Sequence, residues 1–257
     1  MYEYEGLQDV IFIALYCVAA FAALLACVYL LCRRGNAFIQ EKGPESVKTI
    51  ETPSGPLRLG SEVRSSLRLR RWTAALMAAI VGSHVWWYVL GQVWLTDDRL
   101  VRNIIAIALD HVTLVPLTMA VLLAMLQDRR RPLWPWLVAE VAAVVLTAVM
   151  GIARRDEFWG YDVLGYCQLA LIAGFIIYYA LALRYYGRWL RDNYANLEHK
   201  EVWQSLTFAV ALFVVYEVYT SNGGELLREY LSQVVTLVII AFLLWRVETL
   251  QELKDEA

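Results

Sequence analysis

The run VIFIALYCVAAFAALLACVYLLC, residues Val10–Cys32, decides the fold class of this chain. It carries no charged residue, and about 20 apolar residues in a helix are enough to cross the hydrocarbon core of a bilayer. Two glutamates precede the run, and Arg33 and Arg34 follow it. A cleaved signal peptide has a basic leader and a shorter apolar core. We therefore predict an uncleaved first membrane helix with its N-terminus outside.

Alanines recur in this run at four-residue spacing, Ala19 with Ala23 and Ala22 with Ala26. Small residues at this spacing let another helix approach closely. We interpret them as packing positions inside one bundle, in preference to a contact between copies in a homo-oligomer.

The remaining sequence repeats the pattern of the first run. The composition is 60% hydrophobic and 19% charged, and the charges are confined to gaps between long apolar blocks. We predict an all-α polytopic integral membrane protein, a bundle of seven transmembrane helices in the lipid bilayer. The predicted spans are 10–32, 72–95, 103–126, 133–153, 161–186, 202–221 and 227–245.

The distribution of basic residues predicts the orientation. Of the 23 Lys and Arg residues, five fall in segments that are outside when the N-terminus is outside, and the other 18 lie in or beside inner segments. This ratio follows the positive-inside rule. We predict an outside N-terminus, a basic cytoplasmic loop at 33–71 and a cytoplasmic helical tail at 246–257. The five outer residues are Arg99, Arg102, Arg154, Arg155 and Arg228.

The third apolar run, AIALDHVTLVPL at Ala106–Leu117, contains ionisable residues and a proline. An aspartate at the centre of a membrane helix costs about 2.5–3.5 kcal/mol on insertion scales, so such residues usually have a partner or a function. Adjacent helix residues point about 100° apart, so Asp110 and His111 cannot both face one ligand. Pro116 has no N–H for the carbonyl of Val112, which predicts a structural hinge.

Several membrane-embedded polar residues fall at outer-half depth. We predict that His84, Asp110, His111 and Glu217 line a polar cavity that binds an unknown small ligand. The alternative is that each polar group only holds two helices together. For Glu140 and Gln168, an interhelical hydrogen bond is the simpler interpretation.

The candidate chemistries differ in their support. A zinc site needs about three protein ligands, which His84 and His111 with Asp110 or Glu217 could supply. However, no HExxH motif is present, and His199 lies on an inner connection. A retinal-type photoreceptor is excluded because no lysine falls within a predicted span. We assign no catalytic residue and no cofactor, and leave any metal unknown.

Three segments carry a resemblance to a known family: LRDNYANLEHKEVW at Leu190–Trp203, YEVYTSN at Tyr216–Asn222 and WRVETL at Trp245–Leu250. They resemble the membrane sensor region of bacterial membrane-anchored AraC-type helix-turn-helix transcriptional regulators. The resemblance implies a sensory membrane module of the bacterial inner membrane. The output domain is missing here, because the sequence ends at Ala257, so we expect no direct nucleic acid binding.

We therefore expect a sensor or receptor-like signalling module rather than an enzyme. Its cytoplasmic signalling partner would contact the connection at 187–201 or the tail. The alternative is a membrane-embedded metal-dependent enzyme or small-solute transporter that uses the same polar residues. The chain has no internal repeat of the kind common in transporters.

Overall fold

A computed structural model describes residues 7–33, 48–52, 55–59, 65–92, 98–194, 197, 200–220 and 225–253. Side chains are described over most of these ranges, with gaps at 7–9, 48–59, 91–92, 99, 217–220 and 225–229. In chain order the elements are α1 Leu7–Cys32, β1 Lys48–Thr52, β2 Gly55–Leu59, α2 Leu67–Gln92, α3 Arg99–Met125, α4 Trp134–Arg154, η2 Phe158–Val163, α5 Leu164–Asn193, α6 Trp203–Thr220 and α7 Glu225–Thr249.

Six of the described helical segments are long and apolar enough to cross a membrane. A shorter apolar helix, Trp203–Tyr216, accompanies them. The prediction of a helical membrane protein is confirmed at this level. The six segments are Val10–Cys32, Leu67–Leu90, Leu100–Met125, Trp134–Arg154, Phe158–Asn193 and Tyr230–Thr249.

Three features of the elements differ from the sequence analysis. The strands β1 and β2 pair antiparallel, with Lys48 opposite Leu59, within the segment expected to be only a basic loop. The fifth predicted span continues as helix to Asn193, so its last turns project past the predicted boundary. In contrast, α7 ends at Thr249, and residues 250–253 are irregular rather than helical.

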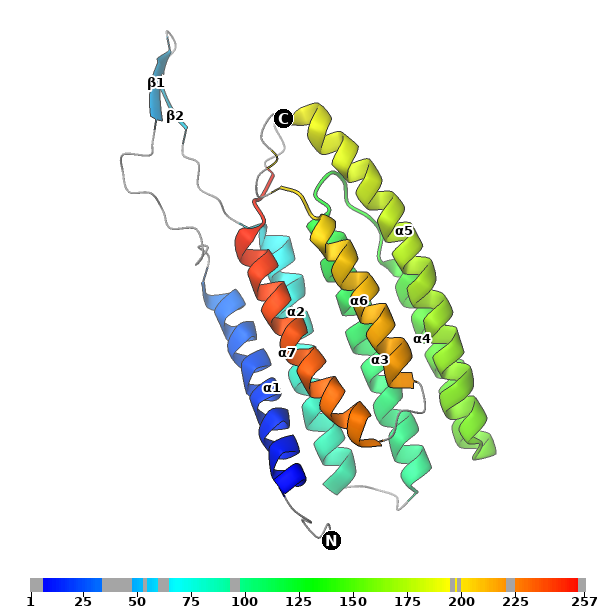
Figure 1. Cartoon of the computed structure of the whole chain (residues 1–257). Helices are drawn as coiled ribbons and strands as arrows, with labels where there is room; N and C mark the ends of the chain where they lie inside the picture. The colour runs from blue at the N-terminus through cyan, green and yellow to red at the C-terminus, as the bar shows by residue number, and fades with distance from the viewer. Residues whose placement is uncertain are drawn as a thin grey trace.

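The helices lie side by side in one bundle (Figure 1). The C-terminal ends of α1, α3, α5 and α7 lie at one end, here named the tail end, and α1 begins at the opposite end. Around the bundle, α1 packs on α2 and α7, α2 also packs on α3 and α7, α3 on α4, α4 on α5, and α5 on α6. By comparison, α6 and α7 touch little.

The α1 alanines occupy the packing positions that their spacing predicts. Ala19 and Ala23 have no exposed surface, while Phe21 and Leu31 on the other side of the helix are about 60% exposed. Large apolar side chains that face outward are expected of a helix surrounded by lipid. The small face is therefore used within the bundle, against α2 and α7.

Glycines allow the closest approach in the bundle, where α4 meets η2. A Cβ atom on Gly151 would lie 2.8 Å from the Cα of Gly160, and one on Gly160 would lie 2.5 Å from Cδ1 of Ile104 on α3. α3, α4 and η2 thus meet at two glycines, where no Cβ atom would fit. This contact fixes the register of α4 against the start of α5.

Candidate functional site

Asp110, at the middle of α3, is bonded to three donors on α2. Its Oδ1 accepts from Ser83 Oγ at 2.6 Å and from Trp86 Nε1 at 3.1 Å, and its Oδ2 accepts from Trp87 Nε1 at 2.7 Å. All three donors lie within about one turn of helix, which is why one carboxylate can reach them. The aspartate therefore joins α2 and α3.

His84 joins α2 to α7. Its Nε2 lies 3.0 Å from Oε1 of Gln233 on α7, and its Nδ1 lies 2.8 Å from the carbonyl oxygen of Ile80. The ring of Tyr16 on α1 packs against the imidazole, with 4.6 Å between ring centroids, and the Tyr16 hydroxyl donates to the His84 carbonyl. Three helices thus meet at this histidine.

His111 joins α3 to α6. Its Nδ1 lies 2.7 Å from the carbonyl of Ile107, so that nitrogen donates, and a neutral ring then accepts at Nε2 from the Tyr216 hydroxyl at 3.2 Å. As predicted for adjacent helix residues, Asp110 and His111 serve different neighbours. Pro116 lies inside α3, which continues to Met125.

The structure thus places three predicted ligand-binding residues at three different helix contacts. Glu217 lies on α6, but its side chain is outside those described. Within the described ranges, no three His, Cys, Asp or Glu side chains come together to hold a metal ion. His84, Asp110 and His111 each have hydrogen-bond partners that explain their burial without a ligand.

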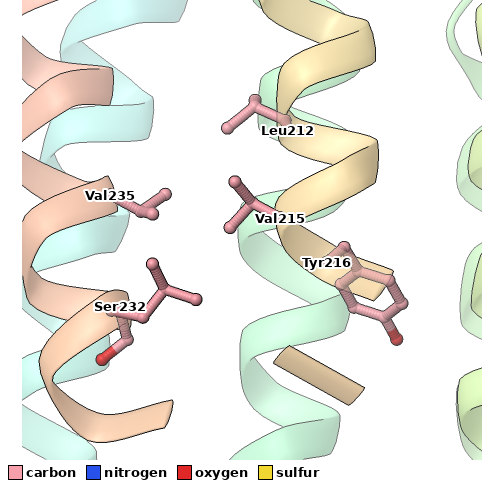
Figure 2. Close-up of a pocket in the computed structure, with 6 residues that line it drawn as sticks. Leu212, Val215, Tyr216, Ser232 and Val235 are labelled. Atoms are coloured by element: carbon pink, nitrogen blue, oxygen red, sulfur yellow. The ribbon is translucent and has the colours of Figure 1, made fainter. Parts of the chain in front are cut away.

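The described cleft lies elsewhere, between α6 and α7. It has a volume of about 190 Å³. Val215 and Val235 reach toward each other across it, whereas the Tyr216 ring turns away from α7 (Figure 2), toward His111. The lining residues are Leu212, Val215, Tyr216, Leu231, Ser232 and Val235. Sequence alone does not separate apolar residues that line a cleft from those that face lipid.

A buried ion pair lies at the tail end. Arg70 on α2 donates from Nη2 to Oε1 of Glu248 on α7 at 2.9 Å, and the two side chains are 4% and 1% exposed. Arg70 also donates from Nη1 to Ser65 Oγ at 2.9 Å. The phenol of Tyr29 on α1 lies beside Glu248. Glu248 falls within the predicted cytoplasmic tail at 246–257, whereas the structure buries its side chain in the bundle.

The segment after α7 is held by the connection between α3 and α4. Gln127 donates from Nε2 to the carbonyl of Gln251 at 2.9 Å and accepts from the Leu253 N–H at 2.9 Å. One turn before the end of α7, Arg246 donates to the carbonyl of Glu201, just ahead of α6, at 2.7 Å. We name the ion pair and these contacts the tail-end latch. The latch ties α7 to α2, α6 and the α3–α4 connection.

Comparison with known protein families, characterised proteins and solved structures finds no match to this chain. Its function is therefore inferred from the geometry of the bundle.

Proposed function

We propose that this protein is a sensor-like signalling module of the bacterial inner membrane. It has seven transmembrane helices, an outside N-terminus and a cytoplasmic C-terminus. In this proposal, a small ligand with an apolar part enters the cleft between α6 and α7. The movement of α7 then reaches a cytoplasmic partner through the tail.

The orientation is supported by the excess of Lys and Arg at the tail end. With α7 ending in the cytoplasm, 18 of the 23 basic residues lie at or beside the cytoplasmic side, in agreement with the positive-inside rule. The resemblance to membrane sensor regions of AraC-type regulators favours the same role. The proposed partner is a cytoplasmic protein.

The observation that carries the proposal is that the cleft lies against α7, the same helix that the tail-end latch holds near its C-terminal end. Val235 at the cleft and Glu248 in the latch are about 20 Å apart along one continuous helix, at 1.5 Å per residue. A ligand that prefers one separation of α6 and α7 shifts the population of that arrangement. The latch would then be strained or released at the other end of the same helix.

The size of the cleft indicates the kind of ligand. Pockets for drug-sized ligands have volumes of about 300–1,000 Å³, and this cleft has about 190 Å³. It therefore suits a very small apolar molecule or one apolar chain of a larger amphiphile.

The metal-dependent enzyme and the transporter were alternatives that used the predicted polar residues. His84, Asp110 and His111 are bonded to α7, α2 and α6 respectively. These contacts provide a structural role for each residue. For this reason the sensor is the function that we propose.

The proposal can be tested without knowing the ligand. Val215→Cys and Val235→Cys, placed in a chain whose native cysteines are replaced, allow a thiol cross-link to close the cleft. We expect the cross-link to change hydrogen exchange at the backbone amides of residues 250–253, and reduction to reverse the change. Each single cysteine variant is the control. Unchanged exchange in the cross-linked protein would show that the cleft and tail are not coupled.

A further inference from the structure

Two polar side chains are completely buried between α4 and α5. Glu140 on α4 and Gln168 on α5 both have 0% exposed surface. Toward the tail end, the Trp136 ring packs edge-on against Phe175 with 5.2 Å between centroids. Toward the other end, Gly151 packs against the backbone of η2. The pair therefore lies in a seam that is closely packed on both sides.

The polar atoms of this pair are close together but unsatisfied. The Gln168 amide lies near enough to interact with the Glu140 carboxyl group. Nevertheless, both carboxyl oxygens and both polar atoms of the amide lack a hydrogen bond of normal geometry. Buried polar atoms are nearly always paired, so four such atoms at one place require an explanation.

A proton on Glu140 would let all four atoms pair after a small adjustment of the two side chains. The carboxylic acid O–H would donate to Oε1 of Gln168, and Nε2–H of Gln168 would donate to the carbonyl oxygen of Glu140. A carboxylate has no donor, so it would leave Gln168 Oε1 unpartnered. We propose that Glu140 and Gln168 form an intramembrane proton-binding site, whose occupied form is a neutral acid–amide pair.

The elements packed on α4 offer no nearby counter-charge among the described residues. On α3, Asp110 is bonded to α2 and His111 to α6. The arginines on the paired helices are about 20 Å or more along the helix axes from the pair; they are Arg154 on α4 and Arg184, Arg188 and Arg191 on α5. The other ionisable groups of η2, and of α5 as far as Tyr179, are the exposed Asp162 and Tyr166, the half-buried Cys167, Tyr161 beside Asn103, Tyr178 against Trp136, and Tyr179 bonded to Ser205.

Loss of the proton would have a structural consequence. It would leave an unpaired carboxylate inside the bundle, where charge is costly. Either water must enter the seam or α4 and α5 must separate, so proton occupancy is coupled to the packing of these helices. The site lies on a different helix pair from the α6–α7 cleft and does not depend on the proposed sensor function.

Infrared spectroscopy of the full chain in lipid bilayers at neutral pH tests this site. We expect the wild-type protein to show the carbonyl-stretch band of an unionised carboxylic acid, and ¹³C-glutamate labelling to shift that band. The band should be lost in Glu140→Gln and kept in Glu252→Gln. The second variant is the control, because Glu252 is an exposed glutamate whose replacement should leave the bundle intact.

Two results would overturn the proposal: no acid band in the wild-type protein, or the same band in Glu140→Gln. A glutamine at 140 can form the same ring with Gln168 without a proton, so this variant should fold. If it does not fold, Gln168→Met supplies the decisive measurement. Removal of the amide should move the acid band to higher frequency, and an unchanged frequency would refute the pairing.

Discussion

Glu248→Gln should destabilise the bundle strongly, because it leaves the Arg70 guanidinium buried without its counter-charge. The two side chains are 4% and 1% exposed and 2.9 Å apart, so water does not replace the lost partner. Removing one member of a buried ion pair typically costs 3–5 kcal/mol. Arg70 keeps its hydrogen bond to Ser65, so we expect the lower limit, about 3 kcal/mol. At about 1.4 kcal/mol per factor of ten, this is roughly a 150-fold change in the unfolding equilibrium.

Steric trapping in bicelles measures this change as a free energy of unfolding. Glu252→Gln is the matched control, since Glu252 is an exposed glutamate just after the same helix, and its replacement should have little effect. The double variant Arg70→Met with Glu248→Met should recover most of the loss, because no unpaired charge remains. A loss below about 1 kcal/mol in Glu248→Gln, the range of solvent-exposed pairs, would refute the interpretation that this pair is desolvated.

Three further predictions follow from the contacts. Gly151→Ala should lower the free energy of unfolding by about 1–3 kcal/mol, since its Cβ would lie 2.8 Å from a backbone atom of Gly160. Gly187 has open space around it, so Gly187→Ala should not lower that free energy. Thermal denaturation of both variants measures the difference. Asp110→Asn should cost about 1–3 kcal/mol and change tryptophan emission, because two indole N–H groups donate to this carboxylate; wild-type stability and emission would contradict its role as a helix tie. Gln127→Ala should speed hydrogen exchange in the segment after α7, where it makes two hydrogen bonds; equal exchange rates would mean that Gln127 does not hold the tail.

The helical membrane architecture could be predicted from the sequence because lipid imposes it. A spanning segment must satisfy its backbone within itself and present apolar side chains, so long uncharged runs identify the helices directly. Boundaries were less predictable. The continuation of α5 to Asn193 and the end of α7 at Thr249 occur among polar residues, where hydropathy no longer constrains the backbone.

The partners of the polar residues could not be predicted in the same way. Hydropathy gives the depth of Asp110 or His111 but not the rotation of α3 or the identity of its neighbours. Similar depth therefore suggested one shared cavity. In the structure, the 100° between adjacent positions directs Asp110 to α2 and His111 to α6. The cleft between α6 and α7 is lined mainly by apolar residues. In the sequence these residues cannot be distinguished from apolar residues that face lipid, so the cleft could not be predicted.

The two buried glutamates show which observation separates structural from functional polar groups in this bundle. In the sequence, Glu140 and Glu248 are both single acids beside apolar residues. In the structure, Glu248 has a cationic partner at 2.9 Å, so its role in holding α7 to α2 is complete without any ligand. Glu140 has two buried oxygens without a hydrogen bond, and in the proposed site a proton supplies the donor that the pair lacks. A buried polar residue thus points to binding when its own bundle leaves it unpaired, which here favours Glu140 over the more conspicuous Asp110.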